Sequence, residues 1–211
     1  MRKGIAISAT ALAALAVTAA PANANSWGDV PPPDKVTIKV INLNGSGCPK
    51  DSATAVVSPD REAFTIAYSA YTVQAGGNIP PIEARKNCLI TLTVLVPGGF
   101  TYAVASTDHR GYADLQPGAI ASQGASYWFQ GHSQTTLTQH SIPVDSTNWQ
   151  FTDKVSIPNL IYRPCGEDRY FIINTELGVR AGTDKSKISL LALDSTDGSI
   201  KTTYHFAWKK C

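Results

Sequence analysis

The chain has 211 residues, with 18 Lys and Arg against 16 Asp and Glu and a formal net charge of +2. Arg2 and Lys3 account for that excess, so the chain beyond residue 24 is formally neutral. It therefore lacks the clustered positive charge with which proteins bind nucleic acid or an anionic membrane. A hydrophobic content of 43% with 16% charged residues excludes an intrinsically disordered chain, and the length suits one domain with a sizeable core.

Residues 1–24 have the pattern of a cleaved export signal. The basic pair Arg2-Lys3 precedes an uncharged, small and apolar run over residues 4–20. The motif Pro21-Ala22-Asn23-Ala24 then fits a signal peptidase site at its end. The alternative is an N-terminal membrane anchor, for which the apolar run is short. We therefore predict a secreted, extracellular protein with no membrane segment after cleavage.

Four cysteines follow this segment: Cys48, Cys88, Cys165 and Cys211. In an oxidising compartment an even number indicates disulfides, and four cysteines allow three pairings. We favour Cys48–Cys88 and Cys165–Cys211, because these sequential pairs close loops of moderate length. The alternative is a zinc site, which would call for closely spaced ligands such as a C-x-x-C pair, and none is present. We expect neither a metal nor another cofactor.

The first half of the chain predicts a tail and then short strands. Residues 25–34 include the run Pro31-Pro32-Pro33, which predicts an extended N-terminal tail. Beyond it, apolar residues recur with a period of two, which is typical of strands. The predicted strands cover residues 36–41, 54–57, 63–68, 88–96 and 100–106. The Gly- and Pro-containing residues 74–87 predict a long loop, and the run 88–96 alternates best, as a central strand would.

The second half continues the same pattern. Strands are predicted over residues 111–115, 125–130, 148–157, 170–179, 187–193 and 202–209. The polar residues 130–148 predict a loop that holds His132 and His140 in solvent. Asp197-Gly198 is a hairpin signal.

The last predicted strand carries an aromatic stripe of Tyr204, Phe206 and Trp208. These residues are expected to face the core, with His205 pointing away from them. No window of ten or more residues has good helical periodicity. The sequence therefore predicts a single-domain, antiparallel, all-β sandwich or jelly roll over residues 35–211, stabilised by two disulfides.

No sequence motif predicts an enzyme. The phosphate-binding and dinucleotide-binding glycine motifs, the H-E-x-x-H metal motif and the G-x-S-x-G nucleophile motif are all absent. Glycoside hydrolysis would need two carboxylates at a set separation, and the sequence does not reveal such a pair. We expect no catalytic residues.

The densest cluster of functional side chains is Asp108-His109-Arg110-Gly111-Tyr112. In one interpretation it forms a binding corner, where Gly111 permits a turn, Arg110 binds a carboxylate or sugar hydroxyls, and Tyr112 stacks on the ligand. In the alternative, Asp108 and Arg110 fix the loop through hydrogen bonds and Tyr112 packs on the core.

Trp128 is the other candidate for ligand binding. Neighbouring residues of a strand point to opposite faces, so Trp128 is expected to point away from Tyr127 and Phe129. An exposed indole could stack on a sugar ring, as it does in carbohydrate-binding sandwiches. The alternative is that Trp128 packs in the core.

Several short motifs occur in order along the chain: Gly45-Ser46-Gly47-Cys48-Pro49, Arg85-Lys86-Asn87-Cys88, Pro97-Gly98-Gly99-Phe100, Arg110-Gly111-Tyr112, Pro164-Cys165-Gly166, Ile173-Asn174-Thr175, Asp194-Ser195 with Asp197-Gly198, and Trp208-Lys209-Lys210-Cys211. The ordered set resembles the secreted DUF4360 family of fungi and bacteria, over about residues 35–211. The resemblance implies secretion, four paired cysteines and a single β-rich domain, but no activity and no catalytic residues. His109 stands where the family more often has an aromatic residue, which argues against His109 as a shared catalytic base.

These observations predict a secreted, monomeric binding module for a polysaccharide or another extracellular protein, without a nucleic-acid partner. Its candidate contacts are Arg110, Tyr112, Trp128, Asp108 and His109. One alternative is a secreted hydrolase of cell-wall polymers, which would require acids or a His–acid pair in a cleft. Another is a protein-binding inhibitor or toxin-like factor, which would act through the predicted loops at 74–87 and 130–148.

Overall fold

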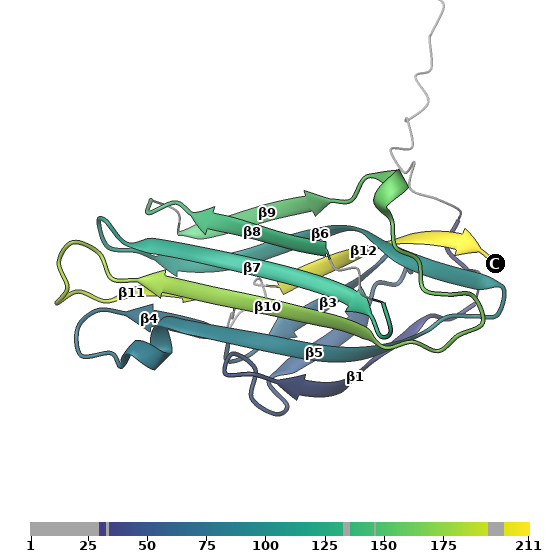
Figure 1. Cartoon of the computed structure of the whole chain (residues 1–211), viewed down its shortest axis with the longest axis horizontal. Helices are drawn as coiled ribbons and strands as arrows, with labels where there is room; N and C mark the ends of the chain where they lie inside the picture. Colours follow the sequence, from purple (N-terminus) through teal and green to yellow (C-terminus); the bar gives the residue numbers. More distant parts are fainter. Residues whose placement is uncertain (1–29, 33, 133–135, 146, 194–200) are drawn as a thin grey trace, which may run out of the picture.

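The computed structural model describes residues 30–32, 34–132, 136–145, 147–193 and 201–211. The predicted export signal, most of the predicted tail and the predicted turn at 194–198 lie outside the described residues. Two antiparallel β-sheets pack face to face, which confirms the predicted all-β sandwich (Figure 1). No helix in the described residues is long and apolar enough to cross a membrane.

Within the described residues, the first sheet has five strands in the order β1-β5-β10-β7-β8. These strands are β1 (Thr37–Asn44), β5 (Arg85–Leu95), β10 (Phe171–Arg180), β7 (Ile120–Phe129) and β8 (Thr136–Ile142). In β10, buried and half-buried residues alternate strictly up to Val179, so one face of this central strand supplies the core and the other faces solvent.

The second sheet has seven strands in the part of the chain that the structure describes. Six follow the order β2-β3-β12-β6-β11-β4, and β9 pairs with β6. Their bounds are β2 (Ala53–Val57), β3 (Ala63–Tyr68), β12 (Lys201–Lys210), β6 (Phe100–Asp114), β11 (Ser189–Ala192), β4 (Thr72–Ala75) and β9 (Asn148–Lys154). Two short 3-10 helices, η1 (Pro81–Ala84) and η2 (Ile157–Asn159), complete the described elements.

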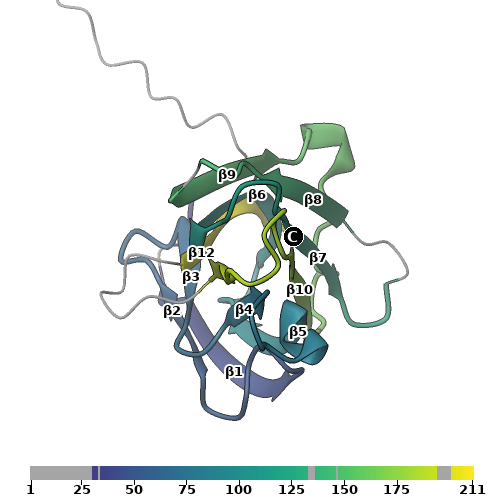
Figure 2. The ribbon, with the colours of Figure 1, turned by 90° about the vertical axis from the view of Figure 1, so that its left-hand side faces the viewer.

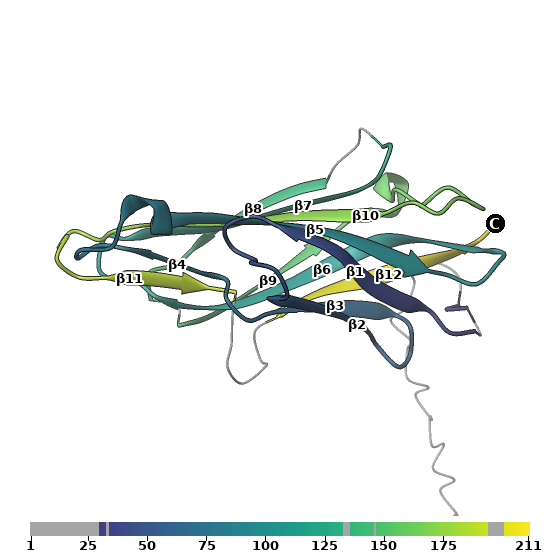
Figure 3. The same ribbon diagram turned by 90° about the horizontal axis from the view of Figure 1, so that it is seen from below.

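The edges of the two sheets meet along both sides of the sandwich. Seen end-on, β8 and β9 lie side by side at one edge (Figure 2). From below, β1 and β2 lie near each other at the opposite edge (Figure 3). At the first edge, His140 on β8 is hydrogen-bonded to Asp153 on β9, with 3.0 Å between Nε2 and Oδ1. This contact joins two strands that belong to different sheets.

Aromatic rings fill the space between the sheets. Phe64 stacks on Tyr204 with 4.8 Å between ring centroids, and Phe171 meets Phe64 edge-on from the opposite sheet at 6.2 Å. Tyr102 contacts Phe129 across the sandwich at 5.3 Å. Offset and edge-on pairs of this kind add to the stability that ring burial provides. The predicted core stripe of the last strand is confirmed, since its three aromatic residues are buried.

Two disulfides are present, and the favoured pairing is confirmed. Cys48–Cys88 fastens the connection between β1 and β2 to the start of β5. Cys165–Cys211 fastens the segment before β10 to the residue that follows β12. Their Cα–Cα separations are 5.3 and 5.7 Å, within the usual range for disulfides.

Three local predictions were wrong. The predicted loop at 74–87 contains the end of β4, the helix η1 and the start of β5. The predicted loop at 130–148 contains β8, an edge strand with a largely polar sequence. Residues 100–114 form one strand, so Gly111 lies within β6 and not at a turn. It is glycine because Trp149 on β9 packs directly over its Cα.

We predict that Gly111→Ala destabilises the fold by about 1–3 kcal/mol, the usual cost of overpacking. The new Cβ would overlap the Trp149 ring and the carbonyl oxygen of Ala192. Gly98→Ala is the matched control, because nothing lies within 4 Å of a Cβ at that site. Urea denaturation of both variants measures the difference, and equal midpoints would contradict this account of Gly111.

Candidate functional site

The solvent-facing surface of the five-stranded sheet carries polar side chains and the indole of Trp128. We call it the outer face. Its members are the outward-pointing residues of the three central strands: Asn87, Leu89, Thr91 and Thr93 of β5, Ile172, Asn174 and Glu176 of β10, and Ser122, Gly124, Ser126 and Trp128 of β7. Trp128 pairs in register with Ile172, which pairs with Thr91 on its other side. These three residues form a row across the sheet.

A groove of about 250 Å³ crosses the outer face beside this row. Its lining comes from four adjacent strands: Arg85, Asn174, Glu176, Ser122, Gly124, Ala125, Ser126, Thr138 and Gln139. Adjacent strands lie about 4.8 Å apart, so the groove extends for about 14 Å. Short side chains on β7 create the hollow, because Ser122, Gly124 and Ser126 leave the sheet surface uncovered.

A neighbouring hollow of about 330 Å³ shares Arg85, Asn174 and Glu176 with the groove and adds Lys86 and Asn87. The two hollows therefore form one depression that reaches the start of β5. It is shallow and open, so it suits a ligand that lies on the sheet.

Two residues that line the depression form an ion pair with each other. Nη2 of Arg85 lies 2.6 Å from Oε2 of Glu176, and both side chains are exposed. An exposed pair of this kind contributes little to stability. Its donors and acceptors, together with the amides of Asn87, Asn174 and Gln139, therefore remain available to a polar ligand.

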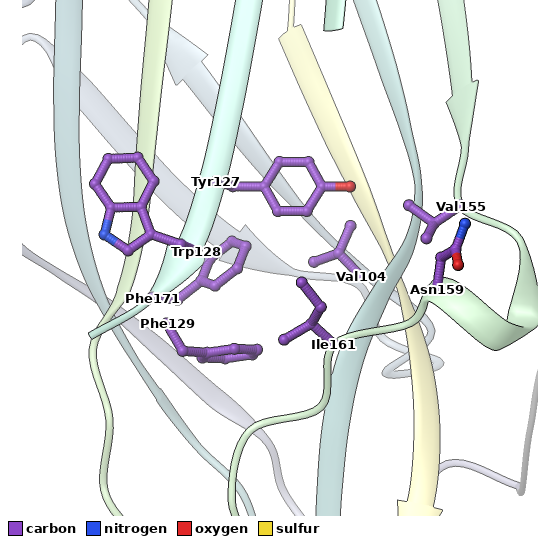
Figure 4. Close-up of a pocket in the computed structure, with 8 residues that line it drawn as sticks. All are labelled: Val104, Tyr127, Trp128, Phe129, Val155, Asn159, Ile161 and Phe171. Carbon is purple, nitrogen blue, oxygen red and sulfur yellow. The ribbon is translucent and has the colours of Figure 1, made fainter. Parts of the chain in front are cut away.

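Trp128 is the next outward-facing residue of β7 after Ser126, which lines the groove. Figure 4 shows its indole on the opposite side of β7 from the rings of Tyr127 and Phe129. Those two rings are buried and line an interior pocket with Ile161, and Trp128 also contributes to its lining. The pocket has a volume of about 10 Å³, which is room for one water molecule at most. The prediction that Trp128 points away from its two neighbours is confirmed.

The other residues predicted to contact a ligand do not lie on the same face as Trp128. Arg110 and Tyr112 are exposed on the far side of the sandwich, where they point outward from β6. Tyr112 has 39% of its surface exposed, so it is not a core residue. A single short ligand cannot touch both Tyr112 and Trp128, because the whole core separates them.

Asp108 lies on the same outward side of β6 and is held by its neighbours. Thr152 donates a hydrogen bond to Oδ1 at 2.5 Å, and Nε2 of His205 lies 2.7 Å from Oδ2. Partial burial raises the pKa of Asp108, but these two hydrogen bonds, together with the charges of His205 and Arg110, outweigh it and hold the pKa below its ordinary value. His205 faces away from the aromatic stripe, as predicted.

His109 points inward from β6 and is fully buried. Its Nδ1 lies 3.5 Å from Nε2 of Gln123 on β7, and its Nε2 lies 3.6 Å from Oδ2 of Asp153 on β9. His140 completes the group, because both carboxylate oxygens of Asp153 lie 3.0 Å from its Nε2. We call His109, Gln123, His140 and Asp153 the cross-sheet polar cluster.

The sequence does not reveal this cluster. Its members come from four strands, β6, β7, β8 and β9, and no spacing along the chain connects them. The prediction that His140 is a solvated loop residue was wrong: its ring is mostly buried and stacks on Phe151 with 4.2 Å between centroids. Because His109 is fully buried, it also does not reach a ligand on the surface.

The environment of His109 disfavours its charged form. Burial lowers the pKa of His109 to about 4, although the carboxylate of Asp153 acts in the opposite direction. His140 adds to the decrease as a second imidazole nearby. Among the described residues, no group of three or more His, Cys, Asp or Glu side chains is arranged to hold a metal ion.

Comparisons with known proteins match most of this chain. The family model named "Domain of unknown function (DUF4360)" matches residues 34–211, which covers all the strands. A protein of the fungus Arthroderma benhamiae, described as an uncharacterized secreted protein, is 34% identical over 189 residues. The alignment covers 89% of this chain and 76% of that protein.

We predict that acid destabilises the protein partly through His109. The folded pKa of about 4 lies below the unfolded value of about 6.5, so between these values the unfolded state binds the extra proton. The contribution of neutral His109 to the free energy of unfolding is fully present above pH 6.5 and is lost as the pH decreases toward 4. At pH 4.5 this loss amounts to about 2–3 kcal/mol relative to pH 7.

The measurement is urea denaturation of wild type, His109→Gln and the control His132→Gln at pH 7 and pH 4.5. His109→Gln should lose less stability on acidification than wild type, and His132→Gln should behave as wild type does. An unchanged pH dependence in His109→Gln would contradict the assignment.

Proposed function

The chain belongs to the DUF4360 family, and we propose that it is a secreted module that binds a polysaccharide through the outer face of its five-stranded sheet. The observation that carries this proposal is the groove of about 250 Å³ on that face. It is lined mainly by short and polar side chains, and Trp128 is the next outward-facing residue of β7 beyond its lining.

The chemistry of the groove suits a sugar. Amide and carboxylate groups on Asn174, Gln139 and Glu176 can donate to or accept from adjacent hydroxyls. A planar ring such as that of Trp128 can cover the apolar face of a pyranose. The depression is open along the sheet, so a polymer could enter and leave without its end being captured.

Secretion is supported by three observations. Residues 1–24 have the pattern of an export signal. Two disulfides are present, which is typical of proteins in oxidising compartments. The relative from A. benhamiae is described as secreted.

Binding without hydrolysis is favoured by the acids of the groove. Glycosidases place two carboxyl groups on either side of the scissile bond. Among the described residues that line the groove, Glu176 is the only acid, and it is paired with Arg85. Among the described residues, the His–acid pairs lie elsewhere: His205 pairs with Asp108 on the opposite face, and Asp153 pairs with two histidines in the cross-sheet polar cluster.

The proposal is tested by incubating the purified protein, without residues 1–24, with insoluble chitin, β-glucan, cellulose and peptidoglycan. The supernatant is examined for lost protein and for released sugar. Retention without release supports a binding module. Release of sugar would make it a hydrolase, and failure to bind any polymer would direct the search to a protein partner.

We predict that Trp128→Ala weakens retention on the bound polysaccharide at least about tenfold, the effect of losing one central aromatic contact. Its Tm should stay within about 4 °C of wild type, because the ring is outside the core. Tyr112→Ala is the matched control, an exposed aromatic residue on the opposite face, and should bind as wild type does. The reverse pattern would place the site on the seven-stranded sheet.

A further inference from the structure

A third hollow, of about 240 Å³, opens beyond the end of the outer face that carries Trp128. Thr93, Leu95 and Tyr170 form its wall on the sheet side, and Arg163, Asp168 and Arg169 come from the segment that leads into β10. We propose that this hollow is an anion-binding subsite that takes the carboxylate or sulfate groups of an acidic polysaccharide. The inference rests on the proposed function and adds the chemical class of the polymer.

Arg163 is the main observation. Its side chain is only 7% exposed, yet its guanidinium carries a permanent positive charge. Nε of Arg163 is buried without a hydrogen-bond partner. A buried charge is costly unless it is paired and hydrogen-bonded. Because Arg163 lines the hollow, an oxyanion there would pair with its charge.

The internal partners of Arg163 are weak. Among the described residues its acidic neighbour is Asp168, with 3.4 Å between Nη1 and Oδ1. The side chain of Asp168 is 94% exposed, so water screens its charge. On its other side, the guanidinium lies over the ring of Tyr102 at 5.9 Å from the centroid, a favourable contact for a cation that satisfies no N–H donor.

The backbone fixes Arg163 in this position. The backbone N–H of Arg163 donates to the carbonyl oxygen of Tyr102 at 2.9 Å, and the hydroxyl of Thr101 donates to the carbonyl oxygen of Arg163. Two residues later, the Cys165–Cys211 disulfide ties the segment to the end of β12. A guanidinium held in this way is pre-organised for a planar, two-oxygen ligand.

Arg169 adds a second cation at the rim. It is partly exposed and bonds to Glu167, with 2.7 Å from Nε to Oε2. Its Nη1 also donates to the carbonyl oxygen of Gln130 at 3.4 Å. The two arginines and two acids balance formally, but the acids are exposed while Arg163 is buried. Charges in a low-dielectric site act more strongly than screened ones, so the base of the hollow favours an anion.

The hollow is continuous with the outer face. Phe171 pairs with Leu92, so the next residues along the two strands, Tyr170 and Thr93, lie side by side. They are one step beyond the row that contains Trp128. Tyr170 is 40% exposed. A chain stacked on Trp128 would therefore bring its substituents over the hollow, and uronate carboxylates or sulfate esters fit its charge.

The test measures binding of polygalacturonate, its methyl-esterified form, dextran sulfate and dextran to the purified protein. Wild type should bind the charged members of each pair more tightly, and added salt should weaken that binding. Preference for polygalacturonate alone would identify a carboxylate ligand, and preference for dextran sulfate alone a sulfate. Equal binding of charged and neutral polymers would overturn the anion subsite and leave the proposed function intact.

Variants locate the effect. Arg163→Gln should raise the Kd for the charged polymer at least tenfold, and Arg169→Gln should raise it severalfold without disturbing the core. Asp168→Asn should lower the Kd, because it removes the competing carboxylate. Arg180→Gln, an exposed arginine at the far end of β10, is the matched control and should bind as wild type does. Unchanged binding by both Arg169→Gln and Asp168→Asn would contradict the proposal.

A second measurement separates this inference from the proposed function. If no polysaccharide binds, the proposed function fails, and sodium sulfate alone then tests the hollow. The gain in Tm from sulfate over sodium chloride at equal ionic strength should be larger for wild type than for Arg169→Gln. Equal gains would reflect only the general stabilising effect of sulfate and would overturn the anion site.

Discussion

The layer of aromatic rings between the two sheets is the interaction on which the rest of the structure depends. Phe64, which stacks on Tyr204 of its own sheet, meets Phe171 of the other sheet, and Tyr102 crosses to Phe129. These rings require every second residue of the central strands to point inward. The residues between them are then free to face solvent, so the core determines which side chains a ligand can reach.

That alternation separates residues that are adjacent in the sequence. Asp108 and His109 are neighbours, yet one is hydrogen-bonded on the surface and the other is buried between the sheets. Tyr127 and Trp128 divide in the same way, with the indole on the outer face (Figure 4). The cluster of charged and aromatic residues around Arg110 is therefore not one site. The outer face, which sequence reasoning identified only through Trp128, brings together polar residues from four strands.

Much of the fold follows from local patterns. Strong apolar alternation identified most of the strands, and the four cysteines identified the two disulfides. The edge strand β8 was missed because it is polar and has one strand partner, so no hydrophobic pattern marks it. The sequence predicted two strands in place of β6 because Gly111 looks like a turn residue. In the structure this glycine makes room for Trp149. The groove and the cross-sheet polar cluster depend on the register between distant strands, which no local pattern encodes.

The most direct test of the central claim is an NMR titration of the ¹⁵N-labelled protein with a soluble oligosaccharide of the polymer that it retains. The account predicts that the amide shifts that change belong to β5, β7 and β10, around Trp128 and Asn174, and that the indole N–H of Trp128 moves with them. Changes confined to β6 and β9, around Arg110 and Tyr112, would contradict the assignment of the outer face as the binding surface.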